Sequence, residues 1–146
     1  MKPVTILRTC AWMHARRAYL HLSAALEREL KPCGLSPPQF MILADLAAHG
    51  PSPLSPLARR LGLERTTLYR TLRPLEADGL VEIIPRDRGR SRVARLRRAG
   101  QARLEQGIPA WIRFDHGTRT AFGPERWPAL ISTLAWLVEA RGESAR

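Results

Sequence analysis

The stretch from Glu64 to Ala77 constrains the fold of this chain more than any other part of the sequence. Its apolar positions Leu68, Leu72 and Leu75 are spaced by four and three residues, which predicts a helix with one buried face. Asp78-Gly79 follows, with glycine at the left-handed position that ends many helices. The opposite face of the predicted helix is polar and basic, with Arg65, Thr66, Tyr69, Arg70 and Arg73.

Two further helices precede this one. Ser36-Pro37-Pro38-Gln39 combines a capping serine, proline at the first helical position and a glutamine that closes a capping box. The helix that follows has a predicted buried stripe of Phe40, Leu43, Leu46 and Ala47, and ends at His49-Gly50-Pro51. Ser55-Pro56 predicts the start of a short helix through Arg60, and Gly62 a tight turn.

After Gly79 the pattern changes from helical to alternating. Val81–Ile84 is short, β-branched and bounded by Pro85, which predicts a strand. Residues 86–90 predict a turn, and the alternation from Val93 to Arg97 predicts a second strand. The two strands together predict a β-hairpin.

Long apolar helices are expected on both sides of this region, over 6–30, from about 99 to 120, and from Gly123-Pro124 to about 141. Their apolar stripes exceed what a small central domain can cover, and include Trp12, Trp111, Trp127 and Trp136. Surfaces of this kind need a partner, which predicts a homodimer.

The charge of the chain indicates an anionic partner. Lys and Arg total 24 against 13 acidic residues, for a formal net charge of +11. From Pro53 to Arg98 there are twelve arginines against five acidic residues. Nucleic acid is the first candidate partner and a membrane surface the second.

The order helix, short helix, turn, helix and basic hairpin is typical of a winged helix-turn-helix. We therefore predict a mainly α fold with a small β wing, as a single domain over 1–146. The winged part spans about 36–98, and the dimerisation helices span about 6–31 and 99–141. A helix fits the major groove of double-stranded DNA, where Arg and Thr can contact bases, and a basic hairpin can lie against phosphates. The predicted DNA-binding residues are Arg65, Thr66, Thr67, Tyr69, Arg70, Arg73, Arg88, Arg90 and Arg92.

The sequence resembles the multiple-antibiotic-resistance regulator (MarR) family over nearly its whole length. The resemblance rests on residues 35–40 (LSPPQF), 57–63 (LARRLGL), 64–81 (ERTTLYRTLRPLEADGLV) and the arginine-rich wing. It implies a homodimeric transcriptional repressor that binds a pseudo-palindromic operator and is released by a small phenolic or lipophilic ligand, or by an oxidant. Three positions depart from the family pattern: Glu64 at the helix cap, Arg88 where the wing usually carries Asp, and Arg97 in place of the usual Thr.

The same resemblance suggests two sensor sites. A cleft between the dimer helices and the wing domain would place Trp12, Arg16, Tyr19, Phe40 and Trp111 around an effector, although ordinary packing explains these aromatic residues equally well. Part of the family senses peroxides through a cysteine in the first helix, so Cys10 is a redox candidate. The position that aligns with the reactive cysteine is Trp12, which favours a structural role for Cys10.

Other functions find little support in the sequence. No catalytic triad, phosphate loop, paired catalytic carboxylates or metal-ligand spacing is recognisable, so neither an enzyme nor a cofactor is expected. No apolar run reaches the ~18 residues of a membrane span, and the N-terminus lacks the features of a signal peptide, which predicts a cytoplasmic protein. The alternatives are a sequence-tolerant architectural DNA-binding protein and a cysteine-based redox-sensing repressor.

Overall fold

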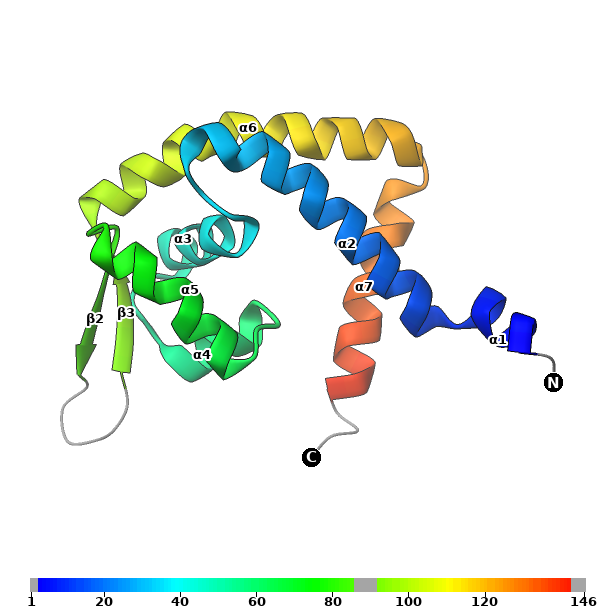
Figure 1. Cartoon of the computed structure of the whole chain (residues 1–146), viewed down its shortest axis with the longest axis horizontal. Coiled ribbons are helices and arrows are strands. Elements are labelled where there is room, and N and C mark those ends of the chain that lie inside the picture. The colour runs from blue at the N-terminus through cyan, green and yellow to red at the C-terminus, as the bar shows by residue number, and fades with distance from the viewer. Residues whose placement is uncertain (1–2, 86–91, 143–146) are drawn as a thin grey trace. The chain divides into compact units, whose positions relative to one another are not determined.

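The computed structural model describes residues 3–85 and 92–142 of the chain (Figure 1). The chain forms two compact units, Met1–Trp111 and Ile112–Arg146. In the described residues the fold is mainly helical with a small sheet, as the sequence predicts, and this sheet has three antiparallel strands rather than the two of the predicted hairpin. The predicted turn over 86–90, with Arg88 and Arg90, lies outside the described residues. In the described part of the chain, no helix is both long and apolar enough to cross a membrane.

The prediction of one helix over 6–30 is wrong at its N-terminal end. Helix α1 spans Pro3–Thr9 and helix α2 spans Ala11–Leu30, because Cys10 between them has an extended backbone (φ −74°, ψ 103°). The ring of His14 donates through Nε2 to the carbonyl oxygen of Arg8 at 3.0 Å. This bond satisfies a carbonyl at the end of α1 and so stabilises the interruption.

Helix α3 spans Pro37–His49 and begins with the predicted capping box. The backbone N–H of Ser36 donates to Oε1 of Gln39 (2.8 Å), and the backbone N–H of Gln39 donates to Oγ of Ser36 (3.4 Å). The predicted burial of Ala47 is wrong, since its side chain is exposed and Ile42 is buried instead. The buried arc is shifted because α3 packs on the sheet and on α5 as well as on α2.

The prediction that Ser55 caps the next helix is also wrong. Helix α4 spans Leu54–Arg60 with Pro53 at its cap position and no side-chain capping bond. The residues before it form strand β1, Ser52–Pro53, which was not predicted from the sequence. Pairing of β1 with a later strand fixes the backbone there, so the helix starts directly after the strand ends.

Helix α5 spans Arg65–Ala77, close to its predicted bounds, and follows a turn at Gly62 (φ 61°). Strands β2, Val81–Pro85, and β3, Arg92–Leu96, form the predicted hairpin. The sheet order is β1-β3-β2, and Ile83 and Ser52 both lie opposite Ala94 of the central strand.

The remaining elements are a short 3-10 helix η1, Lys31–Cys33, helix α6, Arg98–Phe122, and helix α7, Trp127–Gly142. Helix α7 begins later than Gly123-Pro124, because a turn at Gly123 (φ 102°) occupies those residues. Gly107 of α6 lies over the ring of Phe40, where an added Cβ would come within 2.9 Å of the ring. This close approach explains a glycine in the middle of a helix.

A buried charged residue connects α3, α4 and β1. The carboxylate of Asp45, which is 9% exposed, accepts two hydrogen bonds from Arg60, from Nε at 2.9 Å and from Nη2 at 2.5 Å. Nη2 of Arg60 also donates to Oγ of Ser52 at 3.0 Å. The hydrogen bonds from Arg60 lower the pKa of Asp45, against the opposing effect of burial.

We predict that Asp45→Asn lowers the free energy of unfolding at pH 7 by about 1.5–3 kcal/mol, the range for hydrogen bonds to charged groups. Because the pKa of Asp45 is lowered on folding, its contribution is present at neutral pH and is lost as the pH falls through the folded-state pKa. The difference between wild type and variant, measured by urea unfolding, therefore shrinks in acid.

The matched control is Glu82→Gln, which removes a carboxylate from an exposed ion pair. Exposed pairs contribute little, so this variant should change the unfolding free energy much less than Asp45→Asn does. Equal effects of the two substitutions would contradict the structural role assigned to Asp45.

Candidate nucleic-acid interface

Helix α5 has one fully buried face and one open face. Leu68, Leu72 and Leu75 are each at most 1% exposed and fix the helix to the rest of the unit. At 3.6 residues per turn, Thr66, Arg70 and Arg73 lie nearest the side opposite these leucines. All three side chains are exposed, and Thr67 and Tyr69 are half-buried at the flanks. Thr66, Arg70 and Arg73 of the predicted polar face are therefore accessible opposite the leucines, whereas Tyr69 is half-buried at the flank.

The N-terminal end of α5 carries a pair of interacting side chains. The guanidinium carbon of Arg65 lies over the ring of Tyr69, 5.8 Å from its centroid. Glu64 occupies the cap position without making a side-chain capping bond, and the first turn contains no acidic residue. Arg65 thus has an aromatic ring beneath it at a helix end that carries partial positive charge.

The hairpin separates its arginines onto two faces. Side chains alternate along a strand, so Arg92 lies on the same face as Ala94 and Leu96, the face that packs on the helices. Ala94 is fully buried on that face, whereas Arg92 is exposed near the end of β3 that leads to residues 86–91. Arg92 therefore lies on the helix-packing side of the hairpin, beyond its buried part.

The other face of the hairpin holds Glu82, Arg95 and Arg97. Nη2 of Arg95 donates to Oε2 of Glu82 at 2.5 Å, and Nη2 of Arg97 lies 3.5 Å from Oε1 of Glu82. The hydrogen bonds from Arg95 hold the pKa of Glu82 below its usual value, so the carboxylate stays charged. Part of the positive charge predicted for the wing is thus neutralised by a neighbouring side chain.

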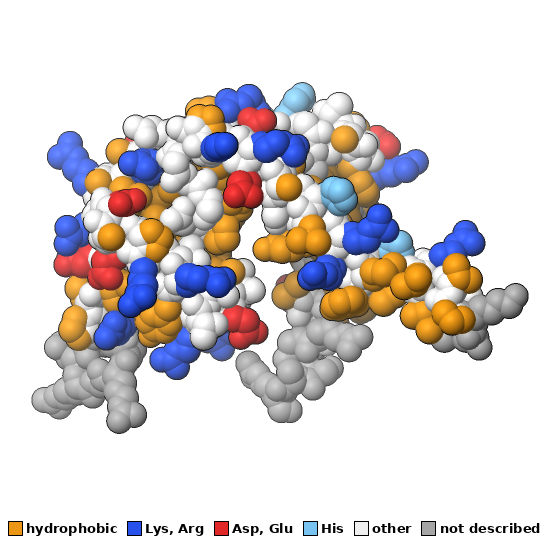
Figure 2. Space-filling model, in the orientation of Figure 1, with side chains coloured by type: hydrophobic (Ala, Val, Ile, Leu, Met, Phe, Trp, Pro, Cys, Tyr) orange, Lys and Arg blue, Asp and Glu red, His pale blue; other side chains and the backbone are white. Residues whose placement is uncertain are grey.

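Figure 2 shows Lys and Arg side chains on the surface over the part of the chain that Figure 1 labels α4, α5, β2 and β3. One arginine of this region does not contribute to an open basic surface, because Arg60 is held by Asp45 and Ser52. This pair was not predicted from the sequence. The signal for it was an aspartate within the apolar run of α3, between Leu43 and Leu46, which requires a buried partner.

The five predicted effector residues have different environments. Trp12 is 72% and Tyr19 65% exposed, and Arg16 between them on α2 is also exposed. Phe40 is buried under Gly107 and belongs to the core, and Trp111 is half-buried. Trp12, Arg16 and Tyr19 are spaced by four and three residues on one side of α2, so these three share a face of the helix.

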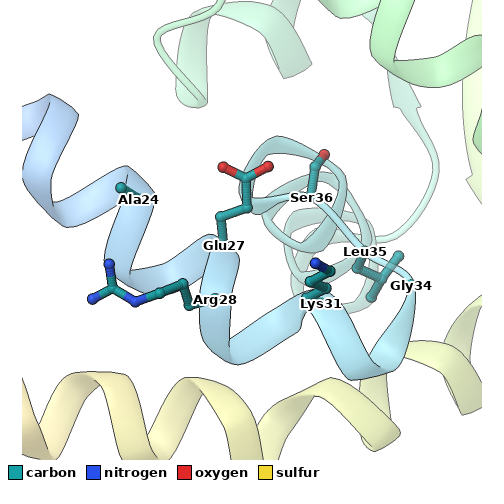
Figure 3. A pocket seen from close by; sticks show the side chains of 7 residues that line it. All are labelled: Ala24, Glu27, Arg28, Lys31, Gly34, Leu35 and Ser36. Atoms are coloured by element: carbon teal, nitrogen blue, oxygen red, sulfur yellow. The ribbon is translucent and has the colours of Figure 1, made fainter.

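A separate pocket lies beside the C-terminal end of α2 and the start of α3 (Figure 3). Its volume is about 530 Å³, and it contains none of the predicted effector residues. Charged side chains of both signs line it, together with the cap of α3: Ala24, Glu27, Arg28, Lys31, Gly34, Leu35 and Ser36. The start of α3 offers it no free donor, because Pro37 and Pro38 lack N–H groups and the capping box uses those of Ser36 and Gln39.

The two cysteines lie in separate places and both are free thiols. Cys10 is half-buried at the interruption between α1 and α2, and Sγ of Cys33 donates to the carbonyl oxygen of Gln106 at 3.4 Å. Redox activity of Cys10 stays a prediction.

A family model and several solved structures are similar to this chain. Residues 35–88 match the model of the MarR family. The transcriptional regulator MosR of M. tuberculosis, solved in complex with DNA, is 34% identical and superposes with a TM-score of 0.83, over 94% of this chain and 99% of MosR. A MarR-family transcriptional regulator from Silicibacter pomeroyi is 28% identical, with a TM-score of 0.74 over 94% of each chain.

BpsR of Bordetella bronchiseptica, whose DNA binding is regulated by 6-hydroxynicotinic acid, has a TM-score of 0.80 and 21% identity, over 90% of this chain and 95% of BpsR. At that identity the likeness concerns the fold. No match was found among curated proteins.

Proposed function

The chain belongs to the MarR family of DNA-binding transcriptional regulators, and on that premise we propose that it acts as a cytoplasmic homodimeric repressor that a small ligand releases from its operator. The proposal rests on the arrangement of side chains around α5. Three fully buried leucines fix one face of the helix, and the exposed Thr66, Arg70 and Arg73 form the other. A helix held in this way can enter the major groove with its polar face toward the bases.

Within this proposal the arginines have different roles. Arg70 and Arg73 on the open face of α5 can donate two hydrogen bonds to O6 and N7 of guanine, and Thr66 can contact a thymine methyl group. Arg92, on the helix-packing side of the hairpin, is available to phosphates. The predicted phosphate contacts of Arg88 and Arg90 concern residues outside the described part of the chain. Arg95 and Arg97 pair with Glu82 on the opposite face of the hairpin, so we propose no DNA contact for them.

The dimer is supported by exposed apolar surface in each unit. In the first unit, α1 and α2 expose large apolar side chains (Figure 2): Val4, Ile6, Leu7, Trp12, Tyr19, Leu20 and Leu22. In the second unit, α7 exposes Ile131, Leu134, Trp136, Leu137 and Val138. A helix that is apolar on all sides is normally buried, so α7 needs a partner surface. A two-fold dimer would place two recognition helices about 10 base pairs apart on the operator.

We predict that Arg70→Gln and Arg92→Gln weaken operator binding in different ways. Loss of a base contact by Arg70→Gln should lower the preference for operator over unrelated DNA by about 5- to 100-fold. Loss of a phosphate contact by Arg92→Gln should weaken binding to all sequences alike and reduce the salt dependence by about one unit of slope. Fluorescence anisotropy titrations at several salt concentrations measure both effects.

The matched control is Arg95→Gln, the same change of charge on the opposite face of the hairpin. It should alter affinity by less than about 2-fold, because Glu82 already neutralises part of that surface. Loss of affinity by Arg95→Gln equal to that by Arg92→Gln would refute the division of the hairpin into two faces.

The effector site is proposed on α2. Trp12, Arg16 and Tyr19 lie on one exposed side of the helix, with the cation between two aromatic side chains. Such a set suits a small aromatic acid, whose ring can stack and whose carboxylate can pair with Arg16. The partner subunit would cover this face in the dimer and complete the site.

We predict that Arg16→Ala raises the concentration of an aromatic carboxylate needed to release operator DNA by about 10-fold, the equivalent of one charge-assisted hydrogen bond. DNA affinity without effector should not change. The assay compares benzoate-type carboxylates with their neutral amides, and Arg17→Ala serves as the control on another side of α2. Equal weakening of release and of DNA binding by Arg16→Ala would refute the assignment.

A further inference from the structure

The first turn of α5 places a cation where the helix itself disfavours one. Arg65 is the first residue of the helix, where the unpaired backbone N–H groups carry partial positive charge. No acidic residue lies in the first turn to compensate, and Glu64 makes no side-chain capping bond. An arginine at this position is therefore not explained by the stability of the helix.

The ring of Tyr69 supplies the compensating interaction. The guanidinium carbon of Arg65 lies over this ring, 5.8 Å from its centroid, one helical turn along α5. An aromatic face carries negative potential and attracts a cation. Tyr69 is half-buried at the flank of the leucine face, whereas Arg65 is exposed. The ring is thus the better fixed member of the pair and can hold the more mobile one.

We propose that Tyr69 is a positioning residue that holds the guanidinium of Arg65 as a preorganised fork for O6 and N7 of one guanine in each half-site. A guanidinium over a ring keeps its five N–H donors in its own plane, free for a bidentate contact at its edge. N-terminal residues of a recognition helix are those that reach base edges in the major groove. The inference rests on the proposed function, since it requires α5 to enter that groove.

If Tyr69 acts through Arg65, substitutions of the two residues should have related effects that a purely structural role of Tyr69 would not produce. Tyr69→Phe keeps the aromatic face, and Tyr69→Leu keeps only apolar bulk at the flank of the leucine face. Arg65→Gln removes the cation. If the ring acts through Arg65, Tyr69→Leu and Arg65→Gln must relax preference at the same base pair, and the double variant must lose no more than Arg65→Gln alone.

The experiment measures affinities of the full-length dimer for the operator selected by the wild type and for duplexes with each base pair substituted in turn. Tyr69→Leu and Arg65→Gln should each lower discrimination at one guanine by about 5- to 100-fold, and Tyr69→Phe by less than about 2-fold. An unchanged thermal unfolding profile of Tyr69→Leu excludes general damage to the fold.

Three results would overturn the inference. If Tyr69→Leu kept its full preference at the guanine while Arg65→Gln lost that preference, Arg65 would need no support from the ring. A uniform loss across all duplexes in Arg65→Gln would show that Arg65 contacts phosphate. If the wild type preferred no DNA sequence, the proposed function itself would be refuted. The first two results, in contrast, would refute only the role of Tyr69 or of Arg65.

Discussion

The hydrogen-bonded ion pair between Asp45 and Arg60 is the interaction on which the arrangement of this chain's DNA-binding part depends. A carboxylate that is only 9% exposed needs bonded partners, and here both its oxygens accept from a single guanidinium. The same guanidinium bonds Ser52. Because Ser52 lies in β1, which pairs with β3, one side chain connects α3, α4 and the sheet. This connection holds α3 and α4 against the sheet, and α5 packs on both of these helices.

The arrangement also determines which arginines can meet DNA. The strong positive charge between Pro53 and Arg98 suggests one continuous basic surface, but the structure divides it. Arg60 is bonded to Asp45 and Ser52, and Arg95 and Arg97 share the carboxylate of Glu82 on one face of the hairpin. Arg65, Arg70 and Arg73 on α5 and Arg92 on β3 are exposed. Net charge therefore overstates how many cations are available to a polyanion.

Much of the fold could be predicted from local sequence signals. The capping box at Ser36, the leucine spacing in α5 and the alternation in the hairpin are patterns confined to a few neighbouring residues, and the structure confirms each element. Strand β1 could not be predicted, because two residues carry no periodicity and Ser52–Pro53 are extended only through pairing with β3. The start of α4 was misplaced for the same reason.

The site was predictable to a similar degree. The exposed face of α5 follows from its leucines, whereas the two faces of the hairpin depend on the register between strands, which no single segment encodes. Phe40 is buried, as predicted for the stripe of its helix, but its close approach to Gly107 joins residues far apart in the chain and is not encoded in any local pattern. Helix α1 ends and α2 begins around Cys10 without a proline or glycine at that point, so the sequence does not predict this interruption.

The proposed function requires two copies of α5 to contact one operator in successive major grooves. Selection of bound duplexes from a randomised pool near physiological salt, followed by sequencing, tests it most directly. Binding by a two-fold dimer predicts an inverted repeat whose half-sites are about one helical turn, or 10 base pairs, apart. Recovery of DNA without a shared motif would contradict base contact by α5 and would indicate a sequence-tolerant architectural protein instead.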